Sequence, residues 1–283
     1  MAYLSFSENW RLMSYSVKLH TLASILLILP LIISCGTLSN GRRWGQDATL
    51  FPGWERIKKS AVNVALEPET WAPAICAAVI QIDDADERIS DWAVKHTPVF
   101  GSEGDARDAS DLMLDATGIA YLATTLATPG GDNAKEWTEA KSKGFAVGVT
   151  GLLVSQGATT YLKEATNRER PDMAGDKSFP SMHTSRASSQ ATLASRNLES
   201  IPMSKTARYA FRAGFTGLAA GTAWARVEGR RHYLGDVLAG YSLGHFISAF
   251  INDAFLGIDS PDEPGLVIEA SKDEFIVGIG WAF

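Results

Sequence analysis

Apolar residues recur along most of this 283-residue chain at the three- and four-residue spacing of helices that bury one face. Proline, glycine and short polar runs separate these stretches, as at Pro129-Gly130-Gly131. The pattern predicts eight helices with no internal repeat or long linker between them. We expect the helices at residues 53–66, 71–82, 84–96, 107–127, 135–166, 182–197, 204–224 and 231–256.

Three charge-free stretches fall within these helices, at residues 144–162, 213–225 and 237–251. Serine, threonine and glutamine dilute the first, and the other two are shorter than the about 20 residues that a membrane span needs. The mean hydropathy of −0.02 is also too low for a protein with six spans. We therefore expect buried core helices in a single soluble bundle, and the predicted fold class is all-α.

The C-terminal residues follow a different pattern. Residues 266–270 and 274–283 are rich in β-branched and aromatic residues and flank the polar turn Ser271-Lys272-Asp273, which predicts a β-hairpin. One hairpin is marginally stable by itself. We expect it to pack on the bundle or to offer a strand edge to a partner.

The N-terminal residues predict secretion. Arg11 and Lys18 precede an uncharged apolar run at residues 22–33, which is too short for a confident membrane span and is typical of a signal peptide. Ser34 and Cys35 follow it and resemble a bacterial lipobox, in which the cysteine is lipidated and becomes the first mature residue. An uncleaved anchor helix and a plain signal peptide are the alternatives.

This interpretation divides the chain into four parts. Residues 1–35 form the signal with its lipobox, 36–52 a tether, 53–256 the helical domain and 257–283 the tail. Lipidation at Cys35 implies an envelope protein that faces the periplasm and is held at a membrane by its lipid. Gly36 is not the aspartate that retains lipoproteins at the inner membrane, so the outer membrane is the expected site.

Charge and cysteine content narrow the function further. The chain has 26 basic and 32 acidic residues, and removal of Glu8, Arg11 and Lys18 with the leader leaves 24 and 31, a net charge of −7. An acidic chain without a basic patch argues against nucleic-acid binding. If Cys35 carries lipid, Cys76 has no partner for a disulfide. Cys76 lies in an apolar run and is expected in the core.

Candidate chemistry is concentrated in three ordered segments of the second half of the chain. Lys163 and Arg170 are seven residues apart and can share a helix face, and Pro171 is expected to end that helix. His232 and Asp236 are four apart, so on a helix the carboxylate can fix one ring nitrogen and leave the other free to attack. Between them lies the tetrapeptide Pro180-Ser181-Met182-His183.

These residue types can hold a phosphoryl group. Arg170 and Arg226 offer planar donor forks, and Lys163 adds a point charge. Ser181 and the backbone N–H groups at Met182 and His183 can donate to a phosphoryl oxygen if they open a helix. Taken singly, each segment is most often a helix cap, a solvated helix end or a surface polar pair.

In this order and spacing the segments resemble the signature of the type 2 phosphatidic acid phosphatase superfamily. It includes lipid phosphatases, bacterial acid phosphatases and vanadium haloperoxidases. The resemblance covers roughly residues 145–252 and implies the helical bundle of the acid phosphatases. Met182 replaces the usual glycine, Ala225 replaces the usual serine, and the loop at residues 172–179 is short.

The resemblance also implies roles. His232 corresponds to the nucleophile that forms a phosphohistidine, Asp236 to its orienting partner, and His183 to the general acid that later activates water. The phosphate cradle then comprises Lys163, Arg170, Ser181, Met182 and Arg226.

The activity implied is a phosphomonoesterase that needs no cofactor. No group of His, Cys or acidic residues shows metal-ligand spacing in the sequence, so no metal site is expected. The substrate is a lipid-linked or a small periplasmic phosphomonoester. Three alternatives stay open: a vanadium-dependent haloperoxidase, a non-catalytic phosphate- or phospholipid-binding lipoprotein, and transfer of the phosphoryl group to an alcohol instead of water.

Overall fold

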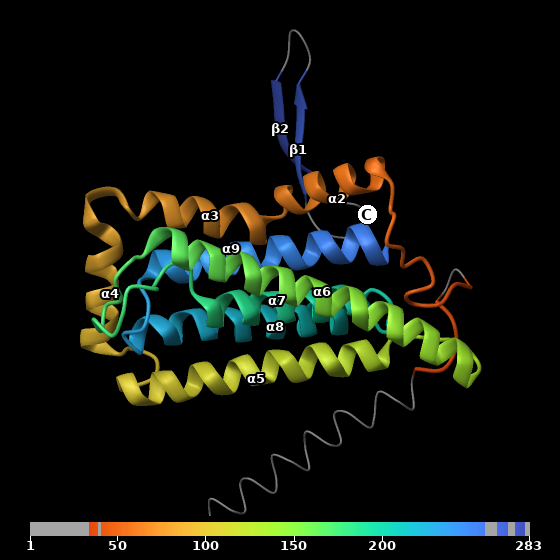
Figure 1. Ribbon diagram of the computed structural model, residues 1–283, viewed down its shortest axis with the longest axis horizontal. Helices are drawn as coiled ribbons and strands as arrows, with labels where there is room; N and C mark the ends of the chain where they lie inside the picture. The colour runs from red at the N-terminus through yellow and green to blue at the C-terminus, as the bar shows by residue number, and fades with distance from the viewer. Residues whose placement is uncertain (1–33, 39–40, 258–264, 271–274, 281–283) are drawn as a thin grey trace, which may run out of the picture.

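The computed structural model describes residues 34–38 and 41–257 together with two strands at 265–270 and 275–280 (Figure 1). The eight predicted helices are confirmed, with ends within a few residues of expectation, and the fold class is all-α. They are α2 (Trp54–Leu66), α3 (Pro68–Val79), α4 (Ala85–His96), α5 (Glu103–Ala127), α6 (Ala134–Thr166), α7 (Met182–Leu198), α8 (Lys205–Glu228) and α9 (Leu234–Ile251). Two short turns of helix, η1 (Ile82–Asp84) and η2 (Asn252–Leu256), follow α3 and α9.

The long helices α5 to α9 lie alongside one another, and α7 is their centre because it packs against α5, α6, α8 and α9 (Figure 1). Helix α3 covers α9 on one side. Helix α4 crosses one end of the bundle (Figure 1). The end of α6, the starts of α7 and α9 and the end of α8 also meet there, so the three segments with candidate chemistry converge.

Small residues allow this convergence. Helix α7 buries Ala187, Ala191 and Ala194 in the core clusters. Gly240 of α9 lies so close to α7 that a Cβ there would come within 2.6 Å of the Ser181 carbonyl oxygen. A larger residue would push the start of α9 away from the start of α7. The close approach therefore fixes the distance between the second and third segments.

A buried network of charges crosses the middle of the bundle. Arg196 of α7 donates to Glu67 at 2.6 Å and to Asp253 at 3.0 Å, and His245 contacts Glu67 at 2.8 Å. Burial raises the pKa of Asp253 to about 6. Glu67, Glu69 and His245 bring three possible metal-ligand atoms within 4.8 Å of one another. No sequence pattern indicated this cluster because His245 is distant from Glu67 and Glu69 along the chain, and Arg196 already supplies its positive charge.

The charge-free stretch of α6 is not a buried core helix as expected. Its glycine, serine and threonine positions, such as Gly148, Ser155 and Thr159, face the bundle. Leu153 and Tyr161 are 62% and 71% exposed. The small polar side chains that dilute its hydropathy are therefore the ones that pack, and the large apolar ones face outward. Among the described helices, the segment Leu234–Leu256 is long and apolar enough to cross a membrane, and just over half of it is buried in the bundle.

Cys76 is exposed, which corrects the expectation that it lies in the core. Helix α3 lies on the outside of the bundle and has no fully buried residue, so an apolar sequence there does not mean a buried one. Cys35 is also exposed, and both thiols are free. Residues 1–33, with the predicted signal peptide, lie outside the described residues.

The segment expected to be a tether contacts the bundle. Gly36 pairs with Gly131, and Trp44 is only 2% exposed. Lys141 of α6 lies over the Trp44 ring and donates to backbone carbonyls at the end of α5, and burial lowers the pKa of Lys141 to about 7. Cys35 therefore sits beside the end of α5 and the start of α6, at the end of the bundle opposite α4.

The predicted C-terminal hairpin is confirmed. Strands β1 (Gly265–Ala270) and β2 (Phe275–Gly280) pair antiparallel, with Gly265 opposite Gly280 and Ala270 opposite Phe275.

Candidate active site

His232 and Asp236 come together at the start of α9. The chain turns back after α8, where Arg230 has a φ of 56° and the His232 N–H donates to the Arg226 carbonyl. His232 lies just before α9, and Asp236 is in its first turn, where the carboxylate accepts the Tyr233 N–H at 2.9 Å. His232 Nδ1 and Asp236 Oδ2 are 3.6 Å apart, so Nδ1 faces the carboxylate as expected and Nε2 is left for chemistry.

Ser178 lies between the two and was not predicted. Its hydroxyl donates to Asp236 Oδ2 at 2.6 Å and is 3.5 Å from His232 Nδ1. A protonated Nδ1 can thus donate to Ser178 Oγ, which holds the ring in the tautomer with a bare Nε2. The sequence placed Ser178 in a short loop, and only the fold brings it to His232.

The positive charges surround this pair. Lys163 is buried at the end of α6 and donates to the Lys177 and Ser178 carbonyls, and burial lowers its pKa to about 8. Arg226 is buried near the end of α8, and burial together with Arg231 lowers its pKa to about 10. Arg170 is close enough to lower the pKa of both. Lys163 and Arg226 are protonated at neutral pH, and the mutual repulsion of the three cations favours an anion among them.

Arg170 reaches the site from a loop, which corrects the prediction of a shared helix face. Helix α6 ends at Thr166 with Asn167 in the left-handed conformation, four residues before Pro171. The Arg170 N–H then donates to the Gly175 carbonyl within the loop. The same loop carries Asp172, which pairs with Arg231 at 2.8 Å.

Within the described part of the chain, three guanidinium N–H groups in this region are buried and have no protein acceptor. They are the Nε–H groups of Arg170, Arg226 and Arg231. A buried donor without an acceptor is costly, and such groups are rare in native proteins. The oxygens of a phosphoryl group are suitable acceptors for such donors. Arg231 was not predicted, although its place beside His232 in the sequence was a signal.

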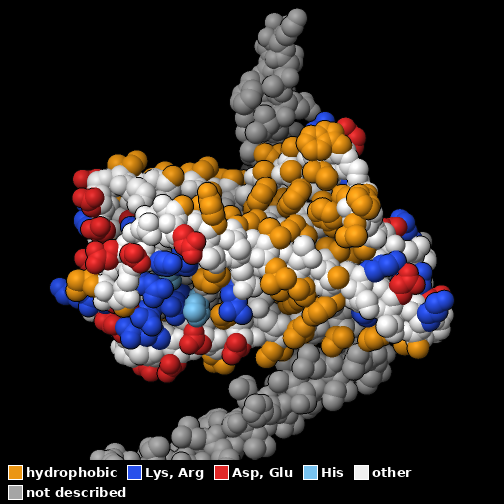
Figure 2. All heavy atoms as spheres, viewed as in Figure 1, with side chains coloured by type: hydrophobic (Ala, Val, Ile, Leu, Met, Phe, Trp, Pro, Cys, Tyr) orange, Lys and Arg blue, Asp and Glu red, His pale blue; other side chains and the backbone are white. Residues whose placement is uncertain are grey.

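His183 stands on the open side of the site. It is in the first turn of α7, is partly exposed, and its Nε2 is 3.1 Å from Asp111 Oδ1 of α5. Burial and Arg226 lower the pKa of His183 to about 4 despite Asp111. Figure 2 shows a histidine among Lys and Arg side chains at this end of the molecule. Asp111 lies far from the motif segments, so sequence reasoning missed it.

Ser181 and Met182 occupy the helix start that was expected. Ser181 is the N-cap of α7 and its hydroxyl accepts the Thr184 N–H, so the interpretation as a cap holds. The hydroxyl proton of Ser181 is still free to point at a ligand. Met182 is the first residue of α7, and its backbone N–H is among those without a partner inside a helix. Ala225 is fully buried, so a hydroxyl there would have little room.

His232 is electrically suited to act as a nucleophile. The ring is 2% exposed, and burial lowers the pKa of His232 to about 4, with Lys163 and Arg226 adding to the effect of burial and Asp236 opposing it. The imidazole is thus neutral at pH 7 and keeps a lone pair for attack. A neutral nucleophile, a fixed carboxylate and several cations can stabilise the charge of a phosphoryl group in transfer.

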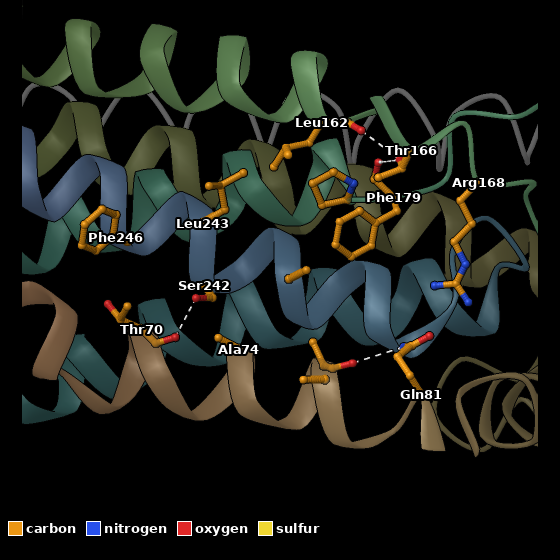
Figure 3. Close-up of a pocket in the computed structure, with 14 residues that line it drawn as sticks. Thr70, Ala74, Gln81, Leu162, Thr166, Arg168, Phe179, Ser242, Leu243 and Phe246 are labelled. Atoms are coloured by element: carbon orange, nitrogen blue, oxygen red, sulfur yellow. Dashed lines mark hydrogen bonds between the residues drawn. The ribbon is translucent and has the colours of Figure 1, made fainter. Parts of the chain in front are cut away.

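An apolar groove of about 770 Å³ runs between α3, α6 and α9 (Figure 3). Its walls are mainly alanine, leucine and phenylalanine side chains. Arg168, which also contacts Asp236 at 2.8 Å, lies at one end of the groove, and Phe246 lies toward the other (Figure 3). Neither His183 nor His232 lines the groove. It reaches the candidate site only through Arg168 and the Phe179-Pro180 segment.

Comparison with known proteins agrees with this geometry. The PAP2 superfamily matches residues 144–256, which contain every predicted catalytic and phosphate-binding residue. Over these residues the chain is similar to the PAP2 superfamily. It is similar in fold to the crystal structure of a transmembrane PAP2 type phosphatidylglycerolphosphate phosphatase from Bacillus subtilis, with a TM-score of 0.50 and 22% identity over 68% of this chain and 94% of that one. None of the curated proteins matches the chain.

Proposed function

We propose that the protein is a phosphatase that hydrolyses phosphomonoesters through a phosphohistidine at His232. One observation carries this proposal. His232 is buried and neutral, its ring faces Asp236 on one side, and buried cations lie around it. Binding alone needs the cations but has no use for a buried imidazole with an oriented tautomer. We therefore favour an enzyme over a non-catalytic phosphate-binding lipoprotein.

The chemistry proceeds in two steps. His232 Nε2 attacks phosphorus, a P–N bond forms, and the P–O bond to the leaving alcohol breaks while protonated His183 gives its proton to the leaving oxygen. Water then attacks the phosphohistidine, His183 takes a proton from the water, and the P–N bond breaks to release phosphate. A bound phosphate dianion next to His183 raises the pKa of the ring, which lets it carry the proton it must donate.

The cations perform the task that metal ions perform in other phosphatases. Lys163, Arg170 and Arg226 are held in place by the protein, so little reorganisation is needed as charge develops on the equatorial oxygens. The unpartnered Nε–H groups of Arg170, Arg226 and Arg231 add directed donors. We infer that catalysis needs no added divalent cation.

Activity is expected to survive EDTA and to be inhibited by vanadate, which resembles the transition state of phosphoryl transfer. The purified protein is assayed with nitrophenyl phosphate, a nucleoside monophosphate and phosphatidate in mixed micelles, with and without EDTA. Loss of activity on chelation, restored by a divalent cation, contradicts the metal-free mechanism. Halide oxidation by the vanadate-loaded protein, without phosphatase activity, would favour the haloperoxidase alternative.

We infer that the substrate is lipid-linked and that one face of the bundle lies against a bilayer. Trp54, Trp71, Ile75, Leu153 and Tyr161 of α2, α3 and α6 are exposed. Figure 2 shows hydrophobic side chains gathered over the middle of one face and the cationic cluster at the end of that same face. Exposed apolar area of this extent is typical of an interaction surface. Preference for phosphatidate over the soluble esters by tenfold or more supports this, and the reverse preference contradicts it.

The proposed lipid anchor constrains how the bundle sits. Ser34, next to Cys35, accepts the Trp137 Nε1–H near the start of α6, and the site is near Lys163 at the other end, about 39 Å away along the helix. A bundle standing on its anchor would hold the site away from the bilayer. A bundle that lies on its apolar face brings both Cys35 and the candidate site to the membrane.

Cys35→Ala is expected to release an active protein into the soluble periplasmic fraction, because the acyl chains of a lipidated cysteine supply much of the membrane affinity. Cys76→Ala, the other exposed thiol, is the matched control and should stay with the membrane. If Cys35→Ala resists high-salt washing but is freed by detergent, the apolar face or an uncleaved leader anchors the protein and the lipid does not.

A further inference from the structure

Asp236 has more partners than the orientation of a histidine requires. Its Oδ1 accepts Arg168 Nη1 at 2.8 Å, and its Oδ2 accepts both the Ser178 hydroxyl and the Tyr233 N–H. The carboxylate is fully buried. A buried carboxylate needs a countercharge, and Arg168 supplies it. His232, at 3.6 Å, is the most distant neighbour of the four.

Arg168 is itself held by a second buried carboxylate. Its Nη2 donates to Asp86 Oδ2 at 2.8 Å, and its guanidinium lies 4.3 Å from the centre of the Tyr233 ring. Gln81 also donates to Asp86, and Figure 3 shows Gln81 and Arg168 at the same end of the apolar groove. The guanidinium is thus fixed by two carboxylates and one aromatic face.

Asp86 connects this pair to the start of α9. It lies at the beginning of α4 and is only 2% exposed. Its Oδ1 accepts the Gly235 N–H at 2.7 Å, and Ser90, one turn later on α4, accepts the Leu234 N–H at 3.0 Å. Helix α4 therefore caps the helix that carries Asp236. Residues 85–96 lie outside the segment that matches the PAP2 superfamily, so this contact belongs to another part of the chain.

We propose that Asp86 and Arg168 are positioning residues that hold Asp236 in place and limit how strongly it acts on His232. The catalytic consequence rests on the proposed function, but the effect on the His232 ring does not. Asp236 shares its negative charge with Arg168, so the carboxylate stabilises a protonated His232 less than an unpaired one would. The nucleophile therefore keeps its lone pair in slightly acid solution.

The charged groups around His232 come from five parts of the chain. Lys163 of α6 and Arg226 of α8 oppose protonation, and Asp236 of α9 favours it. Arg168 and then Asp86 lie behind Asp236. Arg168→Met removes a positive charge and leaves Asp236 with His232 as its main cationic partner, so the pKa of His232 should rise. Asp86→Asn removes the negative charge of Asp86 and leaves Asp236 as the carboxylate that pairs with Arg168. The pKa of His232 should therefore not rise.

The test is an NMR titration of the His232 ring in labelled protein, with kcat/KM measured on the same samples. We expect Arg168→Met to raise the pKa of His232 by about one pH unit and to lower kcat/KM about a hundredfold, because a small displacement of the nucleophile is costly. Arg168→Lys, which keeps the charge, should leave the pKa of His232 near its original value. The matched control is Arg88→Met, since Arg88 makes an exposed ion pair with Asp83 on the same side of the molecule.

Each outcome bears on a distinct claim. Folding of every variant is checked by thermal melting, and Asp86→Asn keeps an oxygen for the Gly235 N–H. If Arg168→Met leaves both the ring pKa and kcat/KM unchanged, or if Asp86→Asn raises that pKa equally, the positioning role is wrong while the phosphatase stands. If the ring responds as expected in a protein without phosphatase activity, the positioning role holds and the proposed function fails.

Discussion

His232→Ala is expected to lower turnover of any phosphomonoester substrate by roughly a thousandfold or more, because the covalent step is lost with its nucleophile. Within the described residues, the polar contacts of the ring are those with Ser178 and Asp236. Substrate binding should change much less, since the cations that hold the phosphate stay in place. The measurement is kcat and KM for nitrophenyl phosphate, together with the affinity for inorganic phosphate.

The matched control for this variant is His96→Ala. His96 ends α4, is exposed, and contacts only the Trp92 carbonyl and ring among the described residues. It should retain full turnover. A His232→Ala protein that binds phosphate normally and still turns over at more than a tenth of the original rate would show that another group, or water, attacks the substrate directly.

His183→Ala is expected to separate the two steps of the reaction. General acid and base catalysis contributes about 10²- to 10⁴-fold, so hydrolysis of alkyl phosphates should fall by that amount. Nitrophenol leaves without help from an acid, so phosphoenzyme should still form from nitrophenyl phosphate and then break down slowly. A burst of nitrophenol equal to the enzyme concentration, followed by a slow steady rate, is the expected record.

The leaving-group comparison gives this prediction its control. Asp111→Asn keeps the shape of the group that contacts His183 Nε2 but removes its charge. The Asp111→Asn variant should turn over alkyl phosphates modestly more slowly and should release only a small burst of nitrophenol. Equal losses for alkyl and nitrophenyl phosphates in His183→Ala, without a burst, would mean that His183 serves binding and not proton transfer.

The sequence predicted the charged groups and the two histidines of the candidate site, but not the residues that hold them in place. Lys163, Arg170 and His232 could be found because the chemistry requires their residue types at fixed spacing. Ser178, Arg168 and Asp86 are ordinary polar residues whose role appears only when α4, α9 and the loop after α6 meet. No local pattern marks such contacts, since the residues are up to about 150 positions apart along the chain.

Helix positions were predicted well for a related reason. Hydrophobic periodicity predicts that a stretch is helical, and the structure has a helix at each of the eight predicted positions. Periodicity does not report which side of an apolar helix is covered. Cys76 and Tyr161 are exposed although their surroundings are apolar, and the small residues Gly148 and Ser155 are the buried ones. A helix that packs through small residues reverses the usual link between hydropathy and burial.

Hydrolysis through a phosphohistidine requires a covalent bond between phosphorus and His232. Brief incubation with a ³²P-labelled phosphomonoester, a quench in base, where phosphohistidine is preserved, and peptide mapping test it most directly. We expect label on the peptide that contains His232, at a higher level in His183→Ala and absent in His232→Ala. Label on a serine, or rapid turnover with no labelled residue in either His183→Ala or the parent protein, would contradict it.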